Sequence, residues 1–162
     1  SYGSHTYEDK NQLVQNNDLY DIASITKIAA STLLAMHLNW KNKFDIDKTL
    51  YDFIPEVTGK TNYGSIVIRE MMAHQSGLTP FIPFYKRTLK NGQLNPEIYS
   101  DTEKDGYDLK VANGIFMKRS YVDSIYKRIL DTPLGTKKYE YSDLCYYFTQ
   151  KSWTRYRSCI AH

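Results

Sequence analysis

Apolar residues recur every three or four positions between Ile22 and Trp40, and no other feature constrains the fold of this chain as strongly. The recurring residues are Ile22, Ile25, Ile28, Ala29, Leu33, Met36 and Trp40. This spacing places their side chains on one face of an α-helix. Asp21 and Ser24 both have side chains that begin helices well, so the pattern predicts a long amphipathic helix that starts at one of them.

Shorter apolar patterns predict helices in the rest of the chain. The expected helices are Lys48–Phe53, Ile66–His74, Tyr121–Leu130 and one that starts near Ser142. Pro55 ends the first of them, and Gly77 is expected to close the second as a left-handed cap. The third carries one apolar face, formed by Val122, Ile125, Tyr126 and Ile129.

The remaining segments set the domain boundaries. Tyr2–Tyr7 alternates in the manner of a strand, whereas Thr79–Gly106 is rich in loop-forming residues. With 162 residues, we expect one domain over residues 1–150. Residues 151–162 lose the apolar period, and we expect either an irregular, non-native tail or an ordinary basic C-terminus. Because Ser1 falls inside the predicted strand, the chain is expected to be a piece of a larger protein.

Charge and cysteine content exclude several classes of function. Twenty-one basic and eighteen acidic residues give a net charge of +3, too little to indicate binding to nucleic acid or to an anionic membrane. The apolar stretch Ile28–Met36 is too short to span a bilayer, and the first residues do not resemble a signal peptide. Cys145 and Cys159 lack the spacing of a zinc site and are expected to be free thiols rather than a disulfide. We expect no metal and no cofactor.

The residues with catalytic potential lie at the start of the long helix. Ser24 and Lys27 are three positions apart, so their side chains share one face of the helix. The positive end of a helix disfavours a cation there and favours the neutral amine, which can take a proton from the Ser24 hydroxyl. The backbone amide of Ser24 could also face a developing oxyanion. The alternative is a serine N-cap followed by a solvated lysine.

Three segments in order resemble one family of enzymes. They are Leu19–Lys27 with its S-x-x-K, Ile68–Leu78 ending H-x-S-G-L, and Gly135–Tyr147 with Tyr141-Ser142-Asp143 in place of Y-x-N. The set resembles the superfamily of serine β-lactamases and penicillin-binding proteins, in the branch of class C β-lactamases, DD-peptidases and related esterases. It is also similar to β-lactamase-like domains attached to bacterial glycoside hydrolases of the family 3 type.

The resemblance assigns roles to individual residues. Ser24 would be the nucleophile that accepts the acyl group, Lys27 its proton partner, and Tyr141 the second acid/base group. A phenol is a weak acid, so Tyr141 could serve only if a cation such as Lys27 stabilises its phenolate. Asp143 would contact substrate, and His74 is expected to be a structural loop histidine. The three side chains Ser24, Lys27 and Tyr141 should converge on one cleft.

The chain also departs from the family pattern. Asp143 replaces the usual Asn, and Cys145 replaces a usual glycine. The family's third motif, a basic residue followed by Ser or Thr and then Gly, is absent from the 162 residues. Two readings remain open. The first is a serine hydrolase domain that cleaves an amide or ester through an acyl-enzyme on Ser24, with weak or no turnover. The second is a non-catalytic helical binding module derived from that fold.

The resemblance has further implications for fold and partners. It implies a mainly α, truncated form of the serine β-lactamase/transpeptidase-like fold, with an incomplete antiparallel sheet and residues 24–40 as the central buried helix. The implied substrate is a small molecule or of peptidoglycan type, and the implied location is the periplasm or cell envelope. Apolar surface left bare by the incomplete sheet favours association, so we expect a homo-oligomer that buries the sheet-facing side of residues 24–40.

Overall fold

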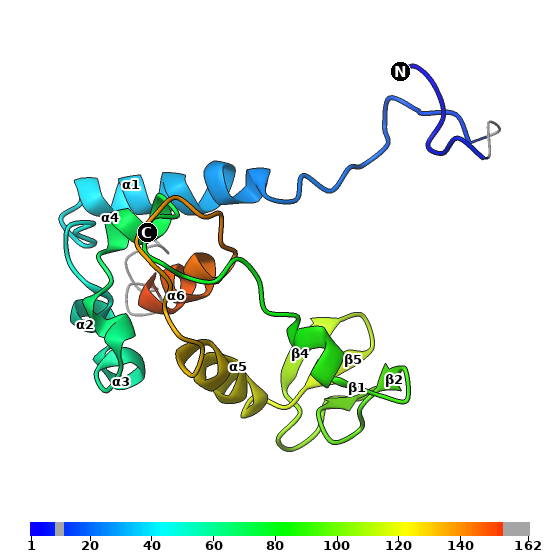
Figure 1. Cartoon of the computed structure of the whole chain (residues 1–162). Helices are drawn as coiled ribbons and strands as arrows, with labels where there is room; N and C mark the ends of the chain where they lie inside the picture. Colours follow the sequence, from blue (N-terminus) through cyan, green and yellow to red (C-terminus); the bar gives the residue numbers. More distant parts are fainter. Residues whose placement is uncertain (9–11, 154–162) are drawn as a thin grey trace. The chain divides into compact units, whose positions relative to one another are not determined.

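A computed structural model describes residues 1–8 and 12–153 of the chain (Figure 1). It contains two compact units, Ser1–Leu34 and the residues from Ala35 onward, and each is described by itself. Helices account for 38% of the structure and short antiparallel strands for 13%. The expected mainly α fold with a small antiparallel sheet is confirmed.

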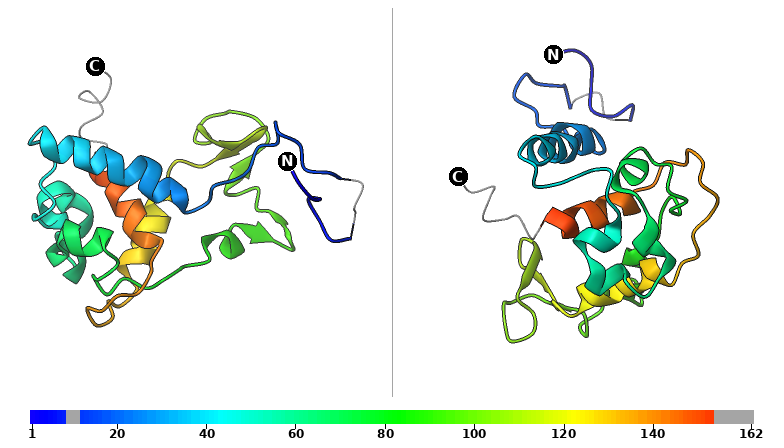
Figure 2. Two further views of the ribbon diagram at one scale, coloured as in Figure 1. Left: turned by 90° about the horizontal axis from the view of Figure 1, so that it is seen from above. Right: turned by 90° about the vertical axis from the view of Figure 1, so that its left-hand side faces the viewer.

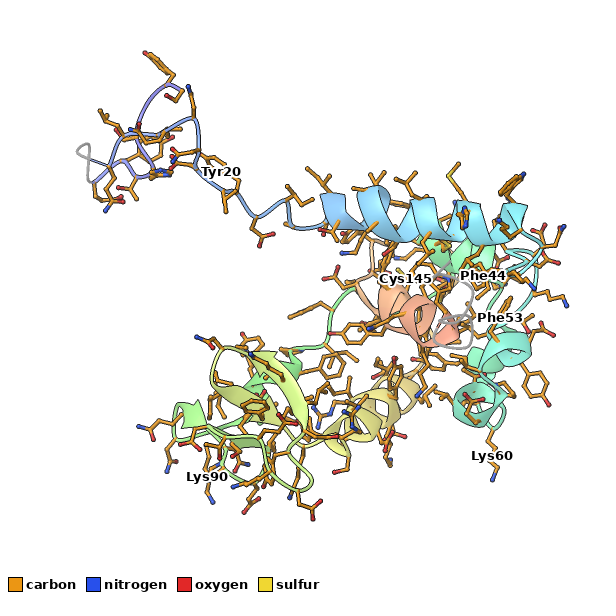
Figure 3. The ribbon with its side chains drawn as sticks, turned by 180° about the vertical axis from the view of Figure 1, so that it is seen from behind. Tyr20, Phe44, Phe53, Lys60, Lys90 and Cys145 are labelled. Atoms are coloured by element: carbon orange, nitrogen blue, oxygen red, sulfur yellow. The ribbon has the colours of Figure 1, made fainter. Side chains whose placement is uncertain are left out.

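The first unit begins with an irregular segment rather than a strand. Ser4 and Leu13 form an isolated antiparallel bridge, and the His5 amide donates to the Gln12 carbonyl at 2.9 Å. No strand is assigned to the described part of residues 2–7, so that prediction is wrong. Only Ser4 of this segment forms a bridge to another segment, and a stable strand needs a longer run of paired residues. Figure 3 labels Tyr20 farther along this irregular segment.

The predicted long helix is present and continuous from Ile25 to Trp40. After one α-helical turn, residues Lys27–Thr32 form a π-helix (η1), and Leu33–Trp40 form the α-helix α1. The Thr32 hydroxyl donates to the Lys27 carbonyl at 3.0 Å. π-Helical turns are rare and wider than α-helical ones, and they change which residues share a face.

The buried face of this helix is not the predicted one. Most of the predicted stripe is exposed: Ile22 50%, Ile25 61%, Ile28 69%, Leu33 57%, Met36 63% and Trp40 74%. The buried residues are Ala35 and Leu38, so the prediction of a central buried helix at residues 24–40 is wrong. Apolar residues occur on both sides of the helix, and periodicity alone does not decide which side is packed.

Besides the end of α1, six short helices lie in the described part of the second unit outside residues 79–117. They are α2 (Leu50–Phe53), α3 (Pro55–Thr58), the 3₁₀-helix η2 (Asn62–Ser65), α4 (Ile68–Met72), α5 (Tyr121–Leu130) and α6 (Leu144–Trp153). Their core contains the rings of Phe44 and Phe53, which pack at a tilt of 40° with centroids 4.7 Å apart. Phe148 of α6 is fully buried between Tyr63 and Tyr126. Figure 3 shows Phe44, Phe53 and Cys145 among the helices, whereas Lys60 and Lys90 point outward.

The sequence predicts most of these helices closely. α5 has the predicted bounds, and its apolar face is buried through Tyr126 and Ile129. α2 ends before Pro55 as expected, although Pro55 then begins α3. α6 begins at Leu144 and continues to Trp153. Residues 151–153, predicted to be irregular, are therefore helical, and the rest of the predicted tail lies outside the described residues.

The end of α4 differs from the prediction. His74, not Gly77, is the left-handed residue that closes the helix, with φ +59°. The Gln75 amide donates to the Glu70 carbonyl and the His74 amide to the Met71 carbonyl, which is the hydrogen-bond pattern of a Schellman cap. Gly77 is needed for a different reason, because a Cβ there would lie 2.4 Å from the Gly135 carbonyl oxygen.

Two small antiparallel sheets lie within residues 89–117. The first pairs β1 (Leu89–Lys90) with β2 (Gln93–Leu94), and the second has the order β3-β5-β4, formed by Tyr99–Ser100, Ile115–Met117 and Leu109–Ala112. A 3₁₀-helix, η3 (Phe84–Arg87), precedes them. The predicted loop region 79–106 thus contains η3 and three short strands. The left view of Figure 2 shows the strands grouped apart from α2 and α3.

The expectation of two free thiols stays a prediction. Cys145 is buried and its thiol donates to the Ser142 carbonyl at 3.0 Å, and Cys159 lies outside the described residues. Among residues 1–8 and 12–153, no helix combines the length and apolar character needed to cross a membrane.

Candidate active site

Ser24 lies in a tight turn that leads into the helix of the first unit. The Asp21 carboxylate accepts a hydrogen bond from the Ala23 amide at 2.7 Å. Ala23 itself has φ +43°, a left-handed conformation that costs a non-glycine residue roughly 1–3 kcal/mol. The next amides, from Ile25 onward, donate three residues back and start the helix. The chain therefore presents the Ser24 side chain from a strained turn at a helix N-terminus.

Lys27 reaches back to Ser24 as its sequence position predicts. Its Nζ donates a hydrogen bond to Ser24 Oγ at 3.0 Å. Lys27 is half-buried, Ser24 is exposed, and no acidic residue occupies the first turn of η1. A hydroxyl within 3.2 Å of an amine is the geometry that a nucleophile and its proton acceptor require.

Tyr141 belongs to the second unit, where His74 holds it. The two rings are in contact at a tilt of 37°, with centroids 4.5 Å apart. His74 Nδ1 accepts a hydrogen bond from the Ser142 amide at 3.1 Å, and the His74 carbonyl accepts one from the Glu140 amide at 2.8 Å. His74 thus binds the segment on both sides of Tyr141, which agrees with the structural role expected for it. The Tyr141 side chain is 42% exposed.

The segment after Tyr141 is fixed by further hydrogen bonds to the chain that follows α4. Ser142 Oγ donates to the Thr79 carbonyl at 2.7 Å, and the Asp143 amide donates to the Pro80 carbonyl at 3.0 Å. The Leu144 amide donates back to Ser142 Oγ at 3.2 Å, at the start of α6. Tyr141 and Asp143 therefore flank a buried serine anchored at both its amide and its hydroxyl.

Comparison with known proteins places the sequence of this chain in a family. A model of the β-lactamase family matches residues 1–148, which include the three segments 19–27, 68–78 and 135–147. The chain belongs to the β-lactamase family. No curated protein and no solved structure matches it. Membership confirms the resemblance at the level of the family, and the assignment to the class C, DD-peptidase and esterase branch stays a prediction.

In this β-lactamase-family chain, the charge of Asp143 acts on a neighbouring phenol. Burial raises the pKa of Tyr147 above its usual value, and the negative charge of Asp143 raises it further. Asp143 thus carries its charge close to the first turns of α6. The family pattern has a neutral Asn at this position, so this chain carries a negative charge where that pattern has none.

The structure brings together some of the predicted site residues. Ser24 and Lys27 are hydrogen-bonded in the first unit, and Tyr141 and Asp143 lie on one anchored segment of the second. The convergence of Ser24 with Tyr141 stays a prediction, as does the substrate contact of Asp143. The ring contact of His74 with Tyr141 was missed, because the two residues are far apart in sequence and no local pattern links them.

Proposed function

We propose that this chain is a β-lactamase-related serine hydrolase domain in which Ser24 forms an acyl-enzyme. The hydrogen bond of 3.0 Å between Lys27 Nζ and Ser24 Oγ carries the proposal. Lys27 in its neutral form takes the hydroxyl proton as Ser24 Oγ attacks the carbonyl carbon of an amide or ester. The carbonyl π-bond becomes an oxyanion, and its collapse expels the leaving amine or alcohol, which receives a proton.

Tyr141 is the proposed second acid/base group, and Asp143 the proposed substrate contact. Together with Lys27, Tyr141 would pass the proton to the leaving group and later activate the water that releases the acyl group. We expect acylation to be slow, because the strand motif that supplies an oxyanion amide in the family is not found in this sequence. The loss of one such donor typically lowers the rate by about 10²–10³. A small-molecule or peptidoglycan-type substrate and a location in the cell envelope remain part of the proposal.

Covalent labelling tests the nucleophile directly. A fluorescent fluorophosphonate or penicillin should add to Ser24, and intact-mass and peptide mass spectrometry should locate the adduct there. Ser24→Ala should abolish labelling, whereas Ser31→Ala removes another hydroxyl from the same helix and should leave it unchanged. Labelling of both variants to the same extent would contradict the assignment.

A second function, a non-catalytic interaction module, is favoured by the exposed side of residues 25–40. Ile25, Ile28, Leu33, Met36 and Trp40 are each more than half exposed, and contiguous apolar surface of this kind marks interfaces. We propose that a second copy of the chain covers this face, which gives a homo-oligomer. Light scattering should then report about twice the 18.9 kDa of one chain at high concentration.

A charge placed on this helix face tests whether the face is an interface between two copies of the chain. Ile28→Glu should shift the oligomer to monomer, because association would bury an unpaired charge. Leu94→Glu puts the same charge on an exposed position of β2 and should leave the mass unchanged. A monomer at all concentrations would contradict the proposed association without bearing on Ser24.

A further inference from the structure

The second unit contains a pocket that the candidate active site does not use. Its volume is about 280 Å³, and six of its ten lining residues are aromatic. None of the ten carries a charge. Two other hollows of this unit differ in that respect, since one is lined by Asp101 and Lys104 and the other by Arg87, Arg128 and Asp131 among others. The uncharged pocket is therefore a distinct chemical environment.

Two walls of the pocket follow from regular secondary structure. Tyr121 and Ile125 are four residues apart on α5, so their side chains lie on one face of that helix. Tyr99 of β3 is paired directly with Met117 of β5, so these two side chains lie on the same face of the small sheet. The helix and the sheet thus each contribute a pair of side chains to the same space.

The other walls come from α6 and from the chain around η3. Phe84 and Tyr147 pack with ring centroids 5.6 Å apart. Thr88 is buried, and its hydroxyl donates to the Tyr85 carbonyl at 2.8 Å. That hydrogen bond satisfies the Thr88 hydroxyl within the protein, so the pocket presents mainly rings and aliphatic groups. Burial raises the pKa of Tyr147, so this wall is partly desolvated, whereas Phe81 and Tyr85 are 59% and 57% exposed.

We propose that this pocket binds an uncharged aromatic group of a small molecule. An apolar cavity of about 150 Å³ is enough to hold benzene, so 280 Å³ has room for a ring with a substituent. Aromatic walls favour stacked and edge-on contacts with another ring. A charged ligand is disfavoured, because no lining side chain would compensate the loss of its hydration.

The pocket lies next to the segment that carries Asp143. The Asp143 amide is hydrogen-bonded to the Pro80 carbonyl, and the pocket wall begins at Phe81, the next residue. Tyr147 also lines the pocket, and the negative charge of Asp143 contributes to the raised pKa of its phenol. The proposal does not require that Ser24 be acylated, so it can hold or fail independently of the hydrolase proposal.

Methionine-methyl NMR of the full chain provides a test with internal controls. The four methionines occupy four environments, with Met117 in the pocket, Met71 in the core, Met72 half-buried and Met36 exposed on α1. Titration with indole should shift the Met117 methyl signal in a saturable manner and leave Met71 unchanged. Indole-3-acetate, which adds a carboxylate to the same ring, should bind about tenfold more weakly or less well still.

Two variants of α5 locate the binding. Ile125→Trp fills the pocket and should remove the saturable shift, whereas Val111→Trp adds the same ring at an exposed position of β4 outside the pocket and should not. Tyr121→Ala removes one wall and should raise the dissociation constant for indole by about tenfold. An unchanged Met71 signal reports that each variant is folded. Indole binding that survives both α5 variants, or shifts all four methyl signals linearly, would overturn the proposal.

Discussion

The two halves of the candidate site are held by different kinds of contact. Ser24 and Lys27 lie one helical turn apart, and their hydrogen bond follows from the local backbone. Tyr141 is held by His74, a distant residue in sequence, through ring contact and through hydrogen bonds on both sides of it. The first half should therefore survive changes elsewhere in the chain. The second depends on long-range contacts that single substitutions can remove.

The largest effect is expected where the chain after α5 crosses the chain after α4. The Gly135 amide donates to the Gly77 carbonyl at 2.8 Å, and Gly77 has φ +77°. Gly77→Ala would place a Cβ 2.4 Å from the Gly135 carbonyl oxygen. We expect the free energy of unfolding to fall by about 2–5 kcal/mol, from the left-handed conformation and the backbone clash together. Urea unfolding measures this loss.

Gly92→Ala is the matched control for this substitution. Gly92 has φ +78°, and a Cβ there would meet nothing within 4 Å. Only the conformational cost remains, about 1–2 kcal/mol. Equal losses in the two variants would show that the close approach of Gly77 to Gly135 does not hold the Tyr141 segment.

A somewhat smaller loss is expected at His74. His74→Ala removes the acceptor of the Ser142 amide and the ring contact with Tyr141. It also places Ala, which adopts the left-handed region less readily than His, at φ +59°. The free energy of unfolding should fall by about 2–3 kcal/mol. His74→Asn keeps a side-chain acceptor in a residue that tolerates this conformation, so it should lose less. If the two variants were equally stable, neither the acceptor for the Ser142 amide nor the tolerance of the left-handed conformation would contribute to stability.

High pH should weaken the second unit through two buried phenols. Burial raises the pKa of Tyr63 to about 12. The pKa of Tyr126 is also raised to about 12, mainly by burial and to a smaller extent by the charge of a nearby Tyr147 phenolate. An unfolded phenol loses its proton near pH 10, so the folded chain holds more protons between pH 10 and 12. Stability should be full below pH 10 and fall as the pH rises toward 12. The urea midpoint at pH 8, 10 and 11 measures this, and Tyr63→Phe should flatten the dependence.

The smallest effect on stability is expected at Lys27. A cation at a helix N-terminus is unfavourable by about 0.3–1 kcal/mol, so Lys27→Met should leave the chain equally stable or slightly more stable. Labelling of Ser24 by the fluorophosphonate should nevertheless slow by about 10²-fold or more, because the hydroxyl loses its proton acceptor. A loss of stability comparable with that of His74→Ala would mean that Lys27 is structural.

The sequence was sufficient for features that local spacing determines. The helix at 121–130, the start of the last helix near Ser142 and the Ser24–Lys27 contact all depend on residues within one or two turns of each other. The wrong predictions concern what a segment packs against. The face formed by Ile25, Ile28 and Met36 was predicted to be buried, but it is exposed. Apolar residues lie on both sides of the helix, and the side with Ala35 and Leu38 is the one that packs.

Long-range contacts explain the other errors. Gly77 was predicted to cap α4, and His74 does so instead. The close approach to Gly135 is the reason for Gly77, and no pattern within residues 66–77 reveals it. The strand predicted at 2–7 likewise required a partner strand, of which only the bridge from Ser4 to Leu13 is present.

The central claim is that Ser24, Lys27 and Tyr141 act as one site, and a distance tests it most directly. The measurement is the separation of Ser24 Oγ and Tyr141 Oη in a crystal structure of the fluorophosphonate-labelled chain. The account predicts a separation near hydrogen-bonding reach, about 2.6–3.2 Å, or slightly longer with one bridging water. A Tyr141 hydroxyl that lies beyond the reach of such a water, while Ser24 is labelled, would contradict it.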